Sequence, residues 1–555
     1  MRSLSKKYLL TSATLCGALL LAACNGDATG SESEEEITED DIGSVGAMES
    51  FEVGDTFVAT EPLDIGILYR DLPAYPLETD WMFFQELEEN NNVTFDITSV
   101  PLSDWEERLN VTMGAGDLPD YSTDIWSGHE TPYVPSGTVL PISDYTHLMP
   151  HFQQRLEDWE GVNEQIENMR QLDGKYYVLP GINENIQFDF SMKYNQTVFE
   201  EYGIEEPQSW DELRDALVIL RDETGTTPLT LWWQGNATFN FGGGSFDTIG
   251  GWGSMDGAMY DPDTEEFVYA PMQQGYKDMI EYFAGLTEDG LMDPEALTQD
   301  DQMARGKLIN QEAFVSSGNI GTITDVNEGL DDQYGEGEFE FSRLPILAGP
   351  NGQVMRGGNT NSGIMLSADV AERDDFLALL QYIDWQYYSD EGTEFAHWGV
   401  EGETFEYTDD LVGGYKPVDG IRYERLNVGA PESLQEDYGF GNAAFAYAGP
   451  AHIRQSIMEE KEFNYQTRMN EEVEILLPDP PRPMSPADQE QASLLSTPLL
   501  DTVDQYTFRF VTGQYSMDRW DEFMEELEAQ NVDAFMELVN EAYADYQEAV
   551  ESATE

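Results

Sequence analysis

The sequence predicts an α/β protein with two large lobes, and three observations support this class. Segments with the alternation of a β-strand take turns with segments of helical spacing, unlike the evenly spaced short strands of a β-sandwich. The chain has 555 residues with 12% aromatic side chains, which is enough to fill two large cores. No long apolar run follows the N-terminal one, so we expect the folded part to lie in water.

The first α/β unit is visible in the hydrophobic pattern that follows the N-terminal segment. Strand-like alternation at 63–68 and 93–97 flanks the segment 81–89, in which apolar residues recur with helical spacing. A second helix is expected at 105–111, and a short buried strand at 121–126. The unit therefore has the order strand, helix, strand, helix, strand.

The N-terminus has the pattern of an export signal. Arg2, Lys6 and Lys7 form a basic start, and residues 9–21 form an apolar stretch that is too short to span a bilayer permanently. The signal ends in Leu-Ala-Ala-Cys with the cysteine at Cys24, and this tetrapeptide resembles a bacterial lipobox. The alternative is an ordinary secretory signal that contains a cysteine by chance.

The lipobox resemblance implies a lipoprotein. A signal peptide of residues 1–23 would be cleaved, and Cys24 would carry diacylglyceryl and palmitate chains that anchor the protein to the extracellular face of the cell membrane. Residues 26–48 are rich in Gly, Ser, Asp and Glu, so we expect 24–60 to form a flexible acidic linker. Cys16 lies in the signal, which leaves the mature chain without a thiol for a disulfide or a zinc site.

The charge balance is extreme, with 26 basic and 109 acidic residues and a formal net charge of −83. Nucleic-acid binding is thereby excluded as a function. The acidic residues are spread along the whole chain, which predicts an acidic, halophilic surface. Salt shortens the Debye length from about 10 Å at 0.1 M to about 3 Å at 1 M, so we expect the fold to require salt.

Several motifs of the folded part occur in a recognisable order. Gly-Asp-Leu-Pro-Asp follows the second predicted helix at 116–120, and Pro-Gln-Ser-Trp-Asp-Glu-Leu at 207–213 starts another helix, with Ser209 as N-cap and Glu212 as capping-box partner. This order resembles the family of extracellular solute-binding proteins (family 1) of ABC sugar importers, and the later motifs resemble its lipoprotein-type members for oligosaccharides. The other matching stretches are residues 140–145, 173–180, 192–195, 382–385, 389–392 and 398–403.

The resemblance implies a periplasmic-binding-protein-like fold, in which two α/β lobes joined by hinge crossovers enclose an interlobe cleft. Crossovers are expected near 176–194 and 341–366. The implied function is that a monomer captures a carbohydrate, an oligosaccharide, and delivers it to the permease subunits of an ABC importer without a cofactor. The expected lobes are 60–178 plus 300–345 for lobe 1 and 179–299 plus 346–555 for lobe 2.

Sugar capture requires flat apolar faces for the ring and planar polar groups for its hydroxyls. Trp232, Trp233, Asn236 and Trp252 lie in a glycine-rich aromatic region that suits this chemistry, although each tryptophan could equally belong to the core. Successive side chains of a strand point to opposite faces, so one of the two adjacent tryptophans is expected to meet solvent or ligand.

A second group of candidates is expected at the lobe junction. Asn359 and Asn361 offer donors and acceptors, and Arg356 offers a fork of donors; the alternative is a glycine-rich turn with local amide bonds. Acidic oligosaccharides are the less favoured ligands because of the net charge, although Arg356 could act locally. The remaining candidates are Trp398, Glu401, Tyr447 and Trp126.

Catalysis and metal binding are the competing classes. The chain lacks the Gly-x-Ser-x-Gly, P-loop and His-Glu-x-x-His motifs. His147 and His151 have helical spacing, but Pro150 between them argues against a shared zinc face. Residues 221–228 lack the alternating oxygen ligands of a calcium loop, and 261–265 has the pattern of a hairpin turn. We therefore expect no enzyme and no metal, with a polysaccharide-acting surface enzyme or a sugar sensor as alternatives.

Overall fold

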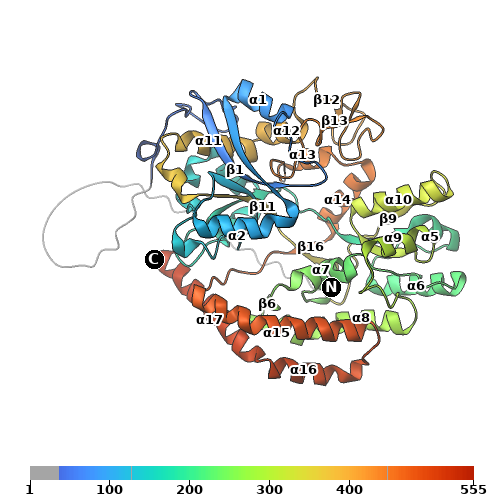
Figure 1. Cartoon of the computed structure of the whole chain (residues 1–555). Coiled ribbons are helices and arrows are strands. Elements are labelled where there is room, and N and C mark those ends of the chain that lie inside the picture. The colour runs from blue at the N-terminus through green and yellow to red at the C-terminus, as the bar shows by residue number, and fades with distance from the viewer. Residues whose placement is uncertain (1–36, 127, 447, 555) are drawn as a thin grey trace, which may run out of the picture. The chain divides into compact units, whose positions relative to one another are not determined.

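A computed structural model describes residues 37–126, 128–446 and 448–554, and it contains two large hydrophobic cores (Figure 1). Buried residues between 57 and 182 and between 364 and 453 form the first core. Buried residues between 188 and 355 and between 465 and 543 form the second. We call the corresponding parts of the chain the first and the second lobe.

The first lobe is built on a five-stranded sheet with the order β2-β1-β3-β11-β4. β1 is parallel to both β2 and β3, whereas β11 is antiparallel to β3 and β4. The strands are β1 (Leu63–Asp71), β2 (Val93–Pro101), β3 (Tyr121–Ile125), β4 (Val178–Ile182) and β11 (Thr360–Leu366). The expected α/β unit is thus present, and its last predicted residue, Trp126, follows the carboxyl end of β3.

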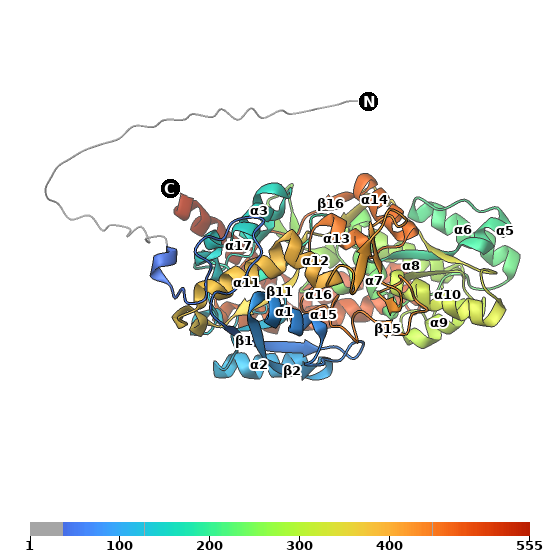
Figure 2. The same ribbon diagram turned by 90° about the horizontal axis from the view of Figure 1, so that it is seen from above.

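Helices cover both faces of this sheet (Figures 1 and 2). Every residue of α11 is buried, because the helix packs between the sheet and other helices of the lobe. His151 Nδ1 on α3 donates to Asp384 Oδ2 on α11 at 2.8 Å, and its Nε2 accepts from the Gly54 amide. The helices are α1 (Met82–Asn91), α2 (Trp105–Ala115), α3 (Pro150–Asp158), α4 (Val162–Glu167), α11 (Phe376–Tyr388), α12 (Asp390–Trp398) and α13 (Ala451–Ser456). Short strand pairs follow α12, formed by β12 (Phe405–Tyr407) with β13 (Tyr415–Pro417) and by β14 (Ile421–Arg422) with β15 (Glu432–Ser433).

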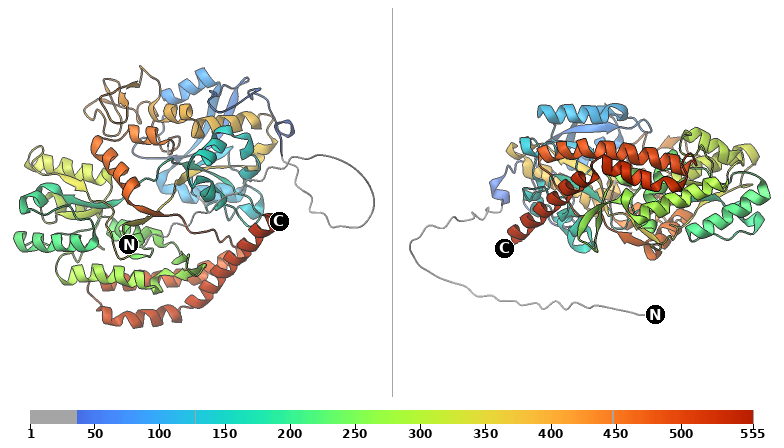
Figure 3. Two further views of the ribbon diagram at one scale, coloured as in Figure 1. Left: turned by 180° about the vertical axis from the view of Figure 1, so that it is seen from behind. Right: turned by 90° about the horizontal axis from the view of Figure 1, so that it is seen from below.

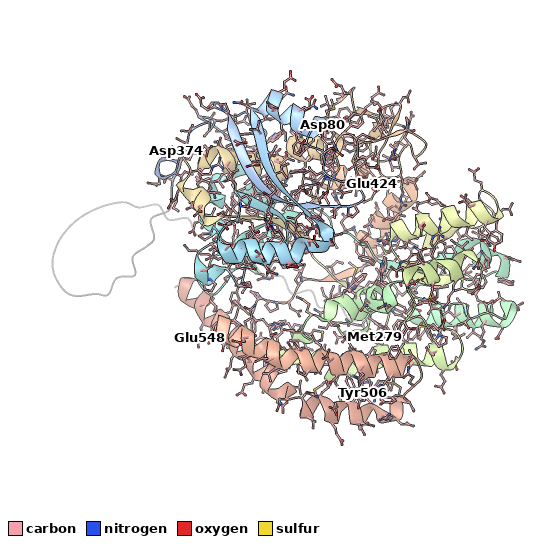
Figure 4. All side chains as sticks on the ribbon, in the orientation of Figure 1. Asp80, Met279, Asp374, Glu424, Tyr506 and Glu548 are labelled. Carbon is pink, nitrogen blue, oxygen red and sulfur yellow. The ribbon has the colours of Figure 1, made fainter. Side chains whose placement is uncertain are left out.

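The second lobe is mainly helical around a three-stranded antiparallel sheet, β8-β5-β9. Figure 3 shows the C-terminal helices α15 and α16 lying along this lobe, where α15 packs on α8 and α17. Met279 of α8 and Tyr506 of α15, labelled in Figure 4, are buried in this core. The strands are β5 (Ser191–Asn195), β6 (Ala258–Asp261), β7 (Glu266–Tyr269), β8 (Val315–Gly318) and β9 (Phe341–Arg343). The helices are α5 (Gln196–Tyr202), α6 (Trp210–Thr224), α7 (Asn236–Gly243), α8 (Gln274–Glu288), α9 (Asp301–Ile309), α10 (Ile320–Tyr334), α14 (Glu460–Glu472), α15 (Pro486–Val511), α16 (Trp520–Ala529) and α17 (Val532–Thr554).

The chain crosses between the cores three times, and this corrects the expected lobe boundaries. The crossovers lie between β4 and β5, between β10 (Val354–Arg356) and β11, and between α13 and α14; β10 pairs in parallel with β16 (Glu474–Leu476). Residues 300–345 belong to the second core, since β8 and β9 both pair with β5. Residues 364–453 belong to the first core, because β11 inserts between β3 and β4.

The expected flexible linker over 24–60 is wrong for its second half. Phe57 is fully buried in the first core, and Phe51 meets the His151 ring edge-on at a centroid distance of 5.3 Å. The Met48 amide donates to Gln381 Oε1 at 2.9 Å. The composition up to residue 48 suggested a tether, but the two phenylalanines after it supply enough apolar surface to hold the segment on the lobe. The signal peptide, Cys24 and the start of the linker lie outside the described residues.

Candidate functional site

A cavity of about 480 Å³ lies between the two lobes, within the range of small-molecule sites. We call it the interlobe cavity. Its wall on the first lobe includes Trp126, Asn183, Asn361, Glu424, Arg425 and Arg454. Its wall on the second lobe includes Gln187, Asp189, Ile320, Glu462 and Gln466. Figure 4 places Glu424 at the edge of the first lobe that faces α10 and α14.

Two of the predicted candidates, Trp126 and Asn361, lie in this cavity. Trp126 has half of its surface exposed, which is unusual for a tryptophan and leaves a ring face open for stacking. Asn361 lies on β11 and accepts from the Ser362 amide at 2.8 Å. Because β3 and β11 are neighbours in the sheet, residues far apart in the sequence meet at one wall of the cavity.

A cluster of three aromatic rings continues from the second-lobe wall, and we call it the aromatic cluster. Phe190 lies 5.4 Å from both Trp233 and Trp252 between ring centroids, and the two tryptophans are 5.5 Å apart. Trp252 is 47% exposed and Trp233 is half-buried. These two tryptophans and Asn236 line a second cavity of about 350 Å³.

The aromatic cluster is held by a strained turn. Trp233 and Gln234 both have positive φ angles, of 50° and 55°, in the left-handed region that non-glycine residues rarely adopt. The Trp233 amide donates to Asp301 Oδ1 at 3.1 Å, which holds the turn against the start of α9. Strain of this kind gathers at functional sites. Trp233 is the more exposed of the two adjacent tryptophans, but they lie in a turn and not in a strand, so the strand alternation on which the expectation was based is wrong.

Trp232 is the buried partner of the pair. Only 5% of its surface is exposed, and the Lys193 ammonium lies 4.0 Å from its ring centroid. Lys193 is itself fully buried, and its Nζ has no hydrogen-bond partner among the described residues. Burial therefore lowers the pKa of Lys193 well below its ordinary value. Trp232 belongs to the core and does not face either cavity.

The candidates after α12 also lie away from the interlobe cavity. Trp398 is completely buried, donates to Ser456 Oγ at 2.6 Å and stacks on Tyr415, so it is a core residue. Glu401 is exposed in the turn that follows the helix. The motif was informative about the family, but its side chains hold the first lobe together. Tyr447 lies outside the described residues.

The lobe-junction candidates have different surroundings: Asn359 is buried in a hydrogen-bond network, whereas Arg356 lines a cavity. Asn359 is buried and donates to the carbonyls of Asn183 at 2.9 Å and Glu184 at 3.1 Å, while its Oδ1 accepts from Gln165. Asn359 therefore has a structural role, but the alternative of local amide bonds is wrong, since its partners lie in α4 and in the crossover after β4. Arg356 pairs with Asp479 at 2.8 Å and lines a third cavity, of about 640 Å³.

Sequence reasoning missed the charged residues of the interlobe cavity. Arg425 follows β14 and Arg454 lies on α13, in segments without any recognised motif. Glu462 on α14 is bound by Arg343 at 2.6 Å in a buried ion pair. Burial lowers the pKa of Arg454, whose Nε has no hydrogen-bond acceptor in the described chain. Their proximity depends on the third crossover, which the sequence pattern did not reveal.

Two further searches gave negative results for the described residues. No group of three or more His, Asp, Glu or Cys side chains among them is placed to hold a metal ion. None of the described helices is both long and apolar enough to cross a membrane.

Comparison with known proteins identifies the class. Residues 75–387, more than half of the chain, match the family of bacterial extracellular solute-binding proteins. The chain belongs to this family, as its motifs predicted. It is therefore a solute-binding protein and not an enzyme.

Individual relatives are distant but cover nearly the whole chain. The fructooligosaccharide ABC transporter substrate-binding protein FusA of Streptococcus pneumoniae is 22% identical over 580 residues, which cover 98% of this chain and 99% of FusA. The structure of FusA in complex with kestose has a TM-score of 0.62 at 19% identity and covers 87% of this chain and 99% of FusA. An HMO-binding ABC-transporter-associated solute-binding protein from Bifidobacterium longum infantis reaches 0.65 at 18% identity, over 88% and 99% of the two chains. The likeness confirms the predicted two-lobed fold.

Proposed function

We propose that this protein captures an oligosaccharide in the interlobe cavity and delivers it to an ABC importer. The observation that carries the proposal is a cavity lined by both lobes in which the exposed Trp126 ring shares a wall with Asn361. A pyranose ring offers C–H faces that stack on an aromatic ring and hydroxyls that pair with planar polar groups. The cavity supplies both kinds of partner.

The aromatic cluster supports a ligand longer than one sugar. Gln187 and Asp189 line the interlobe cavity, and Phe190 in the same crossover contacts Trp233 and Trp252. One continuous segment thus connects the cavity to a second aromatic surface. FusA, which covers nearly all of this chain, is named for fructooligosaccharides, and this agrees with an oligosaccharide as ligand.

Delivery requires a form that the importer can distinguish from the empty protein. Three crossovers between two separate cores give the chain the connections of a hinged protein, and hinge closure around the ligand would bring the two walls together. We propose that permease subunits bind this closed form. Acylation of Cys24 would keep the protein at the extracellular face of the membrane.

A binding screen tests the proposed function. The chain from Ile37 onward, in about 1 M sodium chloride, is melted with and without neutral and acidic mono- and oligosaccharides. A ligand at 100 times its dissociation constant stabilises the folded state by about 2.7 kcal/mol, which gives a visible shift of the melting temperature. A saturable shift with oligosaccharides is expected, and chromatography should recover the sugar unchanged. No shift with any sugar would contradict the proposal.

The membrane anchor has its own test. Metabolic labelling with palmitate should mark the full-length protein, and Cys24→Ser should abolish both the label and retention at the membrane. Cys16→Ser is the matched control, because it removes a thiol inside the signal and should leave both unchanged. Label on the Cys24→Ser protein would contradict the lipidation.

A further inference from the structure

Two arginines of the interlobe cavity lack the carboxylate partner that most of the described Arg and Lys side chains have. With 109 acidic residues available, most of the described Arg and Lys side chains form an ion pair with a carboxylate, as Arg343 does with Glu462 and Arg356 with Asp479. Arg425 and Arg454 form none within the part of the chain that the structure describes, and neither guanidinium group donates a hydrogen bond there. Both line the same cavity.

Because both arginines are at least partly buried, the lack of a carboxylate partner is energetically unfavourable. The Nε of Arg454 is wholly buried without an acceptor in the described residues. Burial lowers the pKa of both guanidinium groups, and nearby carboxylates such as that of Glu424 offset this effect only in part. A buried charged donor without an acceptor is unfavourable, and its cost is recovered only when an acceptor arrives. A ligand in the cavity is the partner in reach.

The guanidinium fork matches a carboxylate better than it matches a hydroxyl. Two parallel N–H groups can bind both carboxylate oxygens, and such charge-assisted pairs are roughly twice as strong as neutral hydrogen bonds. Glu462, on the opposite wall of the cavity, is already paired with Arg343 at 2.6 Å. Asp189, Glu424 and Glu459 also line the cavity, and their oxygens suit the hydroxyls of the same sugar as acceptors.

We propose that the ligand is an oligosaccharide that carries a carboxylate, such as a uronic-acid unit, and that Arg425 and Arg454 bind this carboxylate while Trp126 stacks on a ring. The inference rests on the proposed function, since it places the sugar in the interlobe cavity. The net charge of the whole protein disfavours anions at long range, but in high salt that repulsion is screened within about 3 Å, whereas contacts inside the cavity remain.

The decisive comparison uses matched ligands. Oligogalacturonates and the same oligosaccharides with their carboxyl groups reduced to alcohols are titrated into the chain from Ile37 onward by calorimetry in about 1 M sodium chloride. We expect the acidic form to bind at least about tenfold more tightly than the reduced form. Equal or tighter binding of the reduced form would contradict the inference that the arginines bind a carboxylate, but it would leave the proposed function unchanged. If the protein bound neither form and no other sugar, both this inference and the proposed function would be contradicted.

Variants assign the effect to the two arginines. Arg425→Gln and Arg454→Gln should each weaken binding of the acidic form by about ten- to hundredfold and change binding of the reduced form far less. Arg454→Lys, which keeps the charge but loses the fork, should recover part of the affinity. Arg108→Gln is the matched control, because Arg108 also forms no ion pair with a described residue but lines a separate, small cavity beside α2. Equal losses for both ligand forms would show that the arginines bind hydroxyls, and would overturn the inference.

Discussion

Trp126 is the aromatic side chain with an open face in the interlobe cavity, so its ring should contribute to affinity directly. Trp126→Ala is expected to weaken oligosaccharide binding by about tenfold or more, because stacking and apolar burial are lost together. Calorimetry on the purified variant measures the change. Tyr407→Ala is the control, since Tyr407 has a similar exposure of 51% but lies on β12 away from the cavity. Unchanged affinity of the Trp126→Ala variant would show that the sugar does not stack on Trp126, and would contradict binding at this wall of the interlobe cavity.

His397 gives a prediction about pH. It is buried on α12, and burial lowers its pKa to about 3. An unfolded chain titrates near about 6.5, so between these values the unfolded state binds a proton that the folded state does not. Its contribution to stability is therefore complete above pH about 6.5 and is lost as the pH falls, at about 1.4 kcal/mol per pH unit.

The pH prediction is checked by comparing slopes. His397→Gln should have a smaller loss of unfolding free energy between neutral pH and pH about 5 than the unmodified chain, measured in denaturant. The variant removes the titrating group and keeps a polar side chain of similar length. Identical slopes, or an NMR titration in which the folded His397 ring protonates near its ordinary pKa, would contradict the account.

At the residue scale, sequence identified aromatic candidates better than charged ones. The dipeptide suggested that the two adjacent tryptophans have different surroundings, and Trp232 is buried while Trp233 is half-buried, but a turn and not strand alternation causes the difference. Arg425 and Arg454 had no such signal, because whether an arginine is paired depends on carboxylates brought near by the fold. Trp398 was predicted as a ligand-binding residue because its motif is typical of the family, but its ring is buried in the first core.

At the scale of elements, the segment that precedes β1 has a testable structural role. Phe57 is fully buried, so Phe57→Ala should lower the unfolding free energy by about 3–5 kcal/mol. Val53→Ala in the same segment should change it by less than about 0.5 kcal/mol, because Val53 is 48% exposed. Chemical denaturation measures both. Equal, small effects would mean that the segment is the loose linker that its acidic start suggested.

Local signals predicted elements, whereas pairing between distant strands was not predictable. Ser209 caps α6 and accepts from the Glu212 amide at 3.2 Å, as expected; the Glu212 carboxylate accepts from Gln208 instead of the cap residue. The insertion of β11 between β3 and β4 depends on pairs of residues far apart in the chain, such as Thr360 with Ile182 and Leu366 with Tyr121. No local pattern contains that information, and the lobe boundaries were misplaced for this reason.

For the whole molecule, the net charge of −83 predicts that stability depends on salt. The melting temperature should rise steadily from low to molar sodium chloride, since screening shortens the range of repulsion from about 10 Å to about 3 Å. A sucrose series of equal osmolality separates charge screening from general exclusion effects. A melting temperature that stays constant across the salt series would contradict the halophilic interpretation.

The central claim is that the two lobes close on an oligosaccharide held between them. The sequence has no cysteine after Cys24, so in the chain from Ile37 onward Val111→Cys on α2 and Met303→Cys on α9 place a pair of spin labels on exposed sites of the two lobes. Electron–electron resonance then measures the distance between the labels with and without ligand. The account predicts a distinct shift with an oligosaccharide that binds, and no shift at the same concentration in a Trp126→Ala background. Saturating sugar binding without any change in this distance would contradict it.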